Sequence, residues 1–158
     1  MPIFINDAQK EFFVDCDLLK TQGSNILLFL KCANKELSVL LTDDKTIKEL
    51  NKKYRDQDQT TDVLSFSQND GEESILESRL LGDVVISIST AKKQASQHDL
   101  LLEEEIVLLL IHGTLHLLGF DHEVSHREAY RMKKKTREVF HIIFPNKKPI
   151  ESCSLYSD

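Results

Sequence analysis

The chain has 158 residues, a length that fits one folded domain with its own core. Hydrophobic residues make up 41% and charged residues 29%, which is typical of a globular protein and excludes disordered and fibrous classes. The formal net charge of -6 argues against a protein that coats nucleic acid indiscriminately, because such binding depends on neutralised phosphates. We expect a single domain over residues 1–158.

The cysteines and the apolar segments bear on location. Cys16, Cys32 and Cys153 form no CxxC pair, so we expect free thiols in a reducing compartment. The first residues lack the pattern of an export signal. The longest apolar run, residues 106–120, is too short to cross a bilayer and contains two histidines. We therefore expect a cytoplasmic protein that does not enter a membrane.

Strands and helices are predicted to alternate early in the chain. Residues 3–5 are a short strand, and residues 9–30 have helical character, which Gly23 and Ser24 are expected to interrupt. Residues 37–41 form a compact apolar strand. Residues 42–44 then supply a cap for a helix with apolar residues at helical spacing.

Two further strands, residues 63–66 and 82–88, are separated by the polar segment 68–79, which we expect to be a mobile loop. Ser89 and Thr90 are predicted to cap a helix over residues 91–98.

Only helices are predicted later, over residues 103–118 and from Glu123 to about Phe140, before an irregular tail with Pro145 and Pro149. The order of elements predicts an α+β fold, in which helices cover a small mixed β-sheet.

The segment HGTLHLLGFDH, residues 112–122, carries the strongest chemical signal. His112 and His116 are four residues apart, so they lie roughly 40° apart around a helix axis and can share a metal ion. Gly119 is well placed to end the helix in a left-handed conformation, which would bring His122 back as a third ligand. Three protein ligands leave one position open, as in catalytic zinc sites. A lone histidine would more often be a packing residue, but this spacing is specific.

The same spacing occurs in the HExxHxxGxxH pattern of metzincin peptidases. Gly113 stands where those enzymes have a catalytic glutamate. Because that carboxylate serves as the general base, peptide hydrolysis is disfavoured.

Residues 112–122 resemble the HGxLHLxGYDH signature of the YbeY family of bacterial endoribonucleases and ribosomal RNA maturation factors. The segment NKKYRDQDQTTDVLSF, residues 51–66, is similar to that family's NxxYRxxDxxTDVLSFP segment, and LGDVVIS, residues 81–87, to its LGDIVIS strand. Two departures are visible, because Ser67 stands where the family usually has proline and Phe120 where it often has tyrosine. Neither touches a proposed ligand.

The resemblance implies roles for particular residues. His112, His116 and His122 would hold one zinc ion per chain at the end of a central helix, and Arg55 would join them as a catalytic residue in the groove. A guanidinium can bind a phosphate bidentately and stabilise developing charge. Sequence alone favours an ordinary solvated arginine at position 55, and the family match reverses that preference.

Neighbouring residues admit simpler roles. Asp121 either orients an imidazole or caps the helix that begins near Glu123. Thr61 and Asp62 are expected to form a turn before the following strand. The remaining histidines, which lack ligand spacing, are interpreted as surface or packing residues: His98, His126 and His141.

The resemblance implies a zinc-dependent, single-strand-specific endoribonuclease that matures the 3′ end of small-subunit ribosomal RNA and acts in ribosome quality control. Its partners would be RNA, chiefly ribosomal RNA, and the ribosome or ribosomal proteins, with no DNA, and we expect a monomer. A non-catalytic ribosome assembly factor stabilised by zinc stays open as the alternative, as does a hydrolase of small molecules or peptides.

A basic run lies near the C-terminus. Between Arg127 and Lys148 there are eight basic residues against two acidic ones. This run could attract an anionic partner, although a solvated helix face is the more frequent explanation.

Overall fold

The computed structural model describes residues 3–67, 79–150, 153 and 155 of the chain. Within these residues the elements are β1 (Ile3–Asp7), α1 (Cys16–Phe29), β2 (Glu36–Thr42), α2 (Asp44–Arg55), β3 (Val63–Ser67), β4 (Leu80–Ser87), α3 (Ile88–His98), α4 (Leu102–Leu117) and α5 (His126–Ile143).

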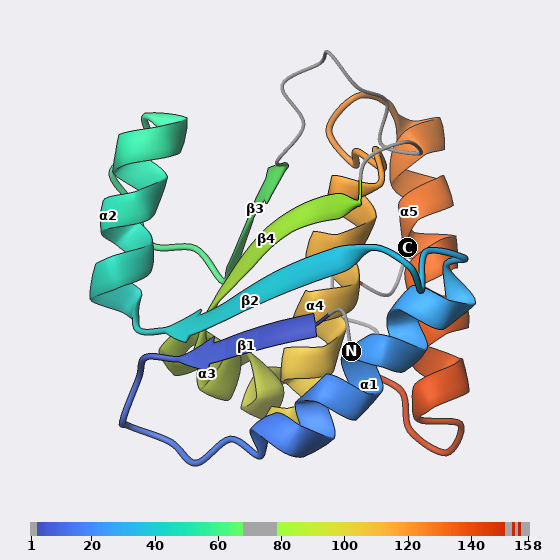
Figure 1. Ribbon diagram of the computed structural model, residues 1–158, viewed down its shortest axis with the longest axis horizontal. Helices are drawn as coiled ribbons and strands as arrows, with labels where there is room; N and C mark the ends of the chain where they lie inside the picture. Colours follow the sequence, from blue (N-terminus) through green and yellow to red (C-terminus); the bar gives the residue numbers. More distant parts are fainter. Residues whose placement is uncertain (1–2, 68–78, 151–152, 154, 156–158) are drawn as a thin grey trace.

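The strands form one mixed sheet in the order β1-β2-β4-β3 (Figure 1). The first three strands in this order run parallel, and β3 runs antiparallel to β4 at the edge. Successive side chains of a strand point to opposite faces, so Val39 and Leu41 enter the main core while Leu40 packs on the other face. The predicted α+β class with a small mixed sheet is confirmed.

The main core lies between one face of the sheet and helices α1, α3, α4 and α5. Helix α4 is at its centre, because every residue from Glu104 to Leu115 is buried. A helix that is apolar on all sides is stable only when other elements surround it.

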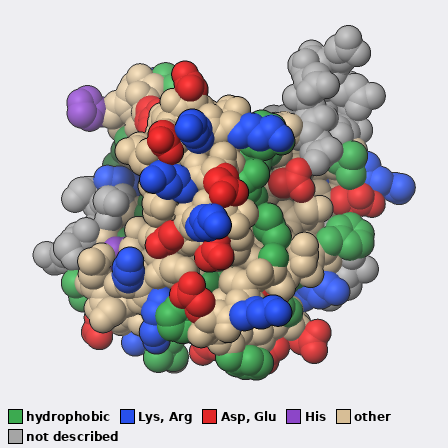
Figure 2. Space-filling view, turned by 90° about the vertical axis from the view of Figure 1, so that its left-hand side faces the viewer, with side chains coloured by type: hydrophobic (Ala, Val, Ile, Leu, Met, Phe, Trp, Pro, Cys, Tyr) green, Lys and Arg blue, Asp and Glu red, His purple; other side chains and the backbone are tan. Residues whose placement is uncertain are grey.

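Helix α2 covers the opposite face of the sheet and stands apart from the other helices in Figure 1. There Ile47 packs against Leu64 of β3 and Val85 of β4. On the outer surface of this side, basic and acidic side chains are interspersed (Figure 2).

The predicted start of the first helix at Gln9 is wrong. Helix α1 begins at Cys16, and the Asp15 side chain caps it by accepting a hydrogen bond from the Leu18 amide at 3.0 Å. Before that point, the Gln9 side-chain oxygen accepts a hydrogen bond from the Phe12 amide at 3.0 Å. Such side-chain contacts to the backbone compete with helix formation.

The predicted interruption at Gly23 and Ser24 is also wrong, because α1 continues through both residues. A Cβ atom at Gly23 would lie 2.7 Å from Cδ1 of Ile3, so the glycine allows α1 to pack closely against β1. A tertiary contact therefore explains this glycine, and a break in the helix does not.

Other element ends shift by smaller amounts. Helix α3 begins at Ile88 and is capped by Ser87, so Ser89 and Thr90 lie inside it and β4 ends before Ile88. Helix α5 begins at His126, later than predicted, because Ser125 provides the cap. Helix α4 agrees closely with its prediction. The predicted loop over residues 68–79 lies, except for Arg79, outside the described residues.

The cysteines are free thiols, and Cys32 and Cys153 are buried. Among the helices that the structure describes, none has the length and apolar character required to cross a membrane.

Candidate metal centre

His112 and His116 lie on the last turns of α4 and point to the same side of that helix. Their Nε2 atoms are 3.1 Å apart, and their ring centroids are 4.6 Å apart. Residues four apart on a helix are neighbours on its surface, which accounts for this approach.

The chain reverses direction directly after α4, at Gly119. This glycine has φ 97°, in the left-handed region that other residues rarely adopt. The Gly119 amide donates to the His116 carbonyl at 3.1 Å, and the Phe120 amide donates to the Leu115 carbonyl at 3.0 Å. These contacts end the helix as in common glycine-terminated caps. The predicted role of Gly119 as the end of the helix is confirmed.

His122 returns to the helix end as a result. Its ring centroid lies 5.3 Å from that of His112 and 5.2 Å from that of His116. One potential ligand atom from each of the three histidines lies within 4.8 Å of the others. The structure thus brings together the three imidazoles that the spacing singled out, and this group could hold a metal ion.

The donor set fits zinc. Two imidazole nitrogens bound to tetrahedral zinc at ~2.05 Å are about 3.3 Å apart, close to the separation found for His112 and His116. Within the described residues, this group of potential ligands consists of the three histidines alone, so a tetrahedral ion held by them would keep one position for water or substrate.

Burial keeps the two helical imidazoles neutral. The pKa of His112 is lowered to about 3, mainly by burial and then by the neighbouring His116 and His122. The pKa of His116 is also lowered, mainly by burial and then by His122. Neutral imidazole is the form that binds a metal ion, so both groups are ready for coordination at neutral pH.

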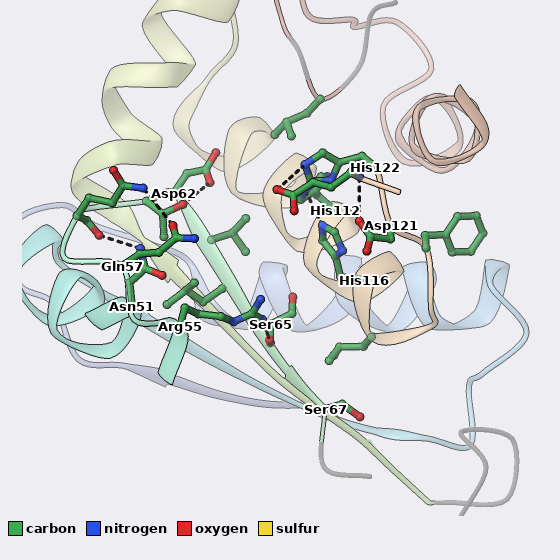
Figure 3. A pocket seen from close by; sticks show the side chains of 18 of the residues that line it. Asn51, Arg55, Gln57, Asp62, Ser65, Ser67, His112, His116, Asp121 and His122 are labelled. Carbon is green, nitrogen blue, oxygen red and sulfur yellow. Dashed lines mark hydrogen bonds and ion pairs between the residues drawn. The ribbon is translucent and has the colours of Figure 1, made fainter. Parts of the chain in front are cut away.

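The three histidines lie in a cleft of about 660 Å³ (Figure 3). One wall consists of α4 and the turn that follows it, and the other consists of β3 and the segment between α2 and β3. Arg55, the last residue of α2, also lines the cleft. The structure therefore places the predicted arginine in the same cleft as the imidazoles.

Two contacts hold the Arg55 side chain. Its Nη2 atom donates a hydrogen bond to the Ser65 carbonyl at 2.6 Å, and its guanidinium carbon lies 5.7 Å from the centroid of the Phe66 ring. A guanidinium has five N–H donors, so one backbone contact leaves others for a ligand.

Ser65 also connects the two walls of the cleft. Its hydroxyl donates to the Gly113 carbonyl of α4 at 2.9 Å. A Cβ atom at Gly113 would lie 2.7 Å from Cγ1 of Val84 and 3.1 Å from Oγ of Ser65. Position 113 thus faces the sheet at close range and has no space for the glutamate of a metzincin. Sequence reasoning noted the missing carboxylate but not this packing role.

Asn51 shapes the other wall, and sequence reasoning assigned it no role. The residue is only 4% exposed, and Nδ2 of its side chain donates to the Gln59 carbonyl at 2.9 Å. The Asn51 carbonyl accepts a hydrogen bond from the Gln57 amide at 3.3 Å. The sequence offered one sign of this role. Asn51 is an amide residue one turn before the end of a predicted helix, and it belongs to the segment 51–66 that resembles the family motif.

Asp121 does not cap α5, because Ser125 does so. Instead, its carboxylate accepts a hydrogen bond from the Glu123 amide at 2.9 Å and forms a turn around His122. Asp121 also raises the pKa of His116, although burial of His116 dominates in the opposite direction.

The other predicted residues lie as follows. Thr61 and Asp62 directly precede β3, where the chain bends at Asp62 but does not form the expected turn. His98 packs inside, with Nδ1 2.6 Å from the carboxylate of the buried Glu105, whereas His126 and His141 are exposed.

This fold and its cluster of three imidazoles define a candidate metalloenzyme. A family profile described as Endoribonuclease YbeY matches residues 5–143. A protein named Endoribonuclease YbeY from Persephonella marina is 46% identical over 138 residues, covering 87% of this chain and 90% of the relative. A protein of the same name from Aquifex aeolicus is 52% identical over 106 residues, covering 67% of this chain and 66% of the relative.

A solved structure agrees with these matches. The solution structure of TM1509 from Thermotoga maritima is similar with a TM-score of 0.63 and 25% sequence identity, covering 90% of this chain and 89% of the other. The chain therefore belongs to the Endoribonuclease YbeY family, and by that membership it is a hydrolytic endoribonuclease.

Proposed function

We propose that this chain is a zinc-dependent endoribonuclease for single-stranded RNA, acting in the maturation of the 3′ end of small-subunit ribosomal RNA and in ribosome quality control. In this proposal it works as a cytoplasmic, monomeric, single-domain protein over residues 1–158, with ribosomal RNA as its main substrate and the ribosome as its main partner. DNA is not a substrate.

The observation that carries the proposal is the presence of Arg55 and the three-imidazole group in one cleft. The imidazoles would hold the ion, and the guanidinium would bind a substrate phosphate beside it. A metal site adjacent to a cationic group that binds phosphate is an arrangement that can hydrolyse a phosphodiester.

The chemistry divides between the ion and the chain. A bound zinc ion supplies Lewis-acid chemistry, because it polarises a phosphoryl oxygen and lowers the pKa of water towards ~7. Arg55 orients the phosphate and stabilises the negative charge that develops on it. The Ser65 carbonyl and the Phe66 ring fix the guanidinium in advance, which limits the conformational entropy lost on binding.

The alternative, a non-catalytic assembly factor, uses the same histidines as a structural site. Structural zinc has four protein ligands. The described residues supply three, which favours the enzyme.

The test combines metal analysis with a cleavage assay. Purified protein should contain about one zinc per chain and should cleave single-stranded ribosomal RNA but not single-stranded DNA. A His116→Ala variant should lose both zinc and cleavage, while His141→Ala, which changes an exposed histidine, should retain both. Full zinc content in a His112→Ala, His116→Ala double variant would contradict the site. Zinc-loaded protein that binds ribosomal RNA without cleaving it would favour the assembly factor.

A further inference from the structure

The basic residues of α5 have no part in the metal cleft described above. This helix contains six basic and two acidic side chains, although the whole chain has a net charge of -6. Helix α5 is therefore positively charged in a molecule whose net charge is negative. Solubility alone does not explain such a local excess of basic residues.

Four residues in the first half of α5 share one exposed side. Arg127, Tyr130, Arg131 and Lys134 follow the i, i+3, i+4, i+7 spacing of a helix face, and all four are exposed. We call these four residues the basic face of α5. The opposite side of the helix enters the core through Met132, Thr136, Val139 and Phe140.

Most of the charge on this face is available to a ligand. Within the part of the chain that the structure describes, Arg127 and Lys134 form no ion pair. Arg131 pairs with Glu128 at 3.1 Å. Glu138, one turn beyond Lys134, is paired with Lys135 at 3.2 Å and so does not neutralise the face.

The basic face is continuous with the cleft. The guanidinium carbon of Arg131 lies 4.2 Å from the centroid of the Phe120 ring, and Phe120 lines the cleft beside His122. Arg55 reaches the cleft from α2, and in Figure 3 it lies on the opposite side of the labelled histidines from α5. Cationic groups from two separate helices therefore flank the imidazoles.

We propose that the basic face of α5 binds the RNA strand where it leaves the metal cleft, through phosphate contacts to Arg127, Arg131 and Lys134 and base stacking on Tyr130. This inference rests on the proposed function and adds a second subsite to it. Tyr130 is 54% exposed and lies between cationic residues of the helix face, and proteins that bind single-stranded nucleic acid combine aromatic and cationic side chains in this way. The side that carries α2 offers interspersed charges of both signs instead (Figure 2).

The test compares two double variants that remove equal charge. Arg127→Gln with Lys134→Gln changes the basic face, and Lys48→Gln with Lys93→Gln changes exposed lysines on α2 and α3. Zinc-loaded proteins are mixed with a trinucleotide or with single-stranded RNA of about 20 nucleotides, longer than common site sizes of ~4–16. Binding is followed by stopped-flow fluorescence anisotropy before cleavage proceeds.

For the long RNA, the α5 variant should bind on the order of 10-fold more weakly at 0.1 M salt, and its slope of log K against log salt should be shallower by about 1.4. The trinucleotide, which fills only the cleft, should bind all variants alike. The α2/α3 variant should match the parent.

Equal losses in both double variants would overturn the proposal, because net charge alone would then explain them. Unchanged RNA binding by the α5 variant would also overturn it. Failure of the parent to bind either RNA would overturn the proposed function itself.

Discussion

The Nη2 atom of Arg55 donates a 2.6 Å hydrogen bond to the carbonyl oxygen of Ser65, while the Ser65 hydroxyl donates to the carbonyl of Gly113 at 2.9 Å. One residue of an edge strand thus joins the arginine on one wall of the cleft to the histidine helix on the other. The distance between the guanidinium and the imidazoles is consequently set by β3.

Replacing Arg55 with alanine should lower kcat for RNA cleavage by roughly 100- to 1,000-fold, as removal of one preorganised donor does in other enzymes. Zinc content and the free energy of unfolding should change little, because Arg55 is exposed and is not a metal ligand. Single-turnover cleavage and elemental analysis measure the two effects. The control is Lys53→Ala, which removes a neighbouring cation that does not line the cleft. Equal rates for Arg55→Ala and the parent would show that the arginine is an ordinary surface residue.

The metal-free protein should lose stability as the pH falls below about 6.5. Burial, together with the neighbouring His116 and His122, lowers the pKa of His112 in the folded state to about 3. As the pH falls, the unfolded chain therefore binds a proton at this position before the folded protein does. Stability then decreases with falling pH by up to ~1.4 kcal/mol per pH unit for each such proton. This loss continues until the pH reaches the folded-state pKa.

Urea unfolding at pH 7.5 and pH 5 measures this effect. In a His112→Gln variant the decrease should be smaller, because position 112 no longer titrates. An identical pH dependence in the variant and the parent would mean that His112 is not the source.

The two glycines of the histidine motif should respond differently to alanine. Gly113→Ala should destabilise the fold by about 1–3 kcal/mol, because the new Cβ overlaps Val84 across a packed contact. A Cβ at Gly119 meets nothing within 4 Å, but φ 97° strains any L residue, at ~1–2 kcal/mol.

Zinc affinity separates the two variants. Gly119→Ala should weaken it, since the turn that returns His122 is altered. Folded Gly113→Ala protein should retain it. Urea unfolding and zinc titration with a competing chelator provide the measurements, and equal zinc affinity in both variants would contradict the assigned role of the turn.

These glycines illustrate how far the sequence predicts the site. The spacing of His112, His116 and Gly119 is local, so helix geometry and one left-handed residue were enough to predict the cluster. The role of Gly113 depends on Val84 and Ser65, which are distant in sequence and adjacent only after the sheet and α4 have packed. No local pattern contains that information.

The same distinction explains the errors in the fold. The apolar residues near Phe12 fit a helical period, but Phe13 is 88% exposed and Asp15 caps the helix that follows. The sequence alone favours a break at Gly23, because the contact with Ile3 that explains this glycine is tertiary and leaves no local signal. Helix α4 was predicted well because a long apolar run that is buried on all sides needs no periodicity.

The last prediction concerns Asn51, which holds the wall of the cleft opposite the histidines. Asn51→Asp replaces an amide that donates to the Gln59 carbonyl with a carboxylate that, when ionised, faces that oxygen without a proton. The side chain is almost fully buried, so desolvation raises the pKa of the new carboxyl group above the usual ~3.9. A protonated carboxyl group can still donate a hydrogen bond to Gln59, whereas the ionised form cannot.

The sign of the pH effect follows from this shift. Because the folded state holds the proton more tightly than the unfolded chain, the stability of the Asn51→Asp variant relative to the parent should be highest at low pH and should fall as the pH rises through the raised pKa. Asn51→Ala should lose about 1 kcal/mol at every pH, because it forfeits one hydrogen bond and introduces no charge. The matched control is Asn25→Asp, which adds the same charge at an exposed position of α1 and should show neither effect. Urea unfolding between pH 5 and pH 8 distinguishes the three variants, and a pH-independent cost for Asn51→Asp would contradict the assigned hydrogen bond.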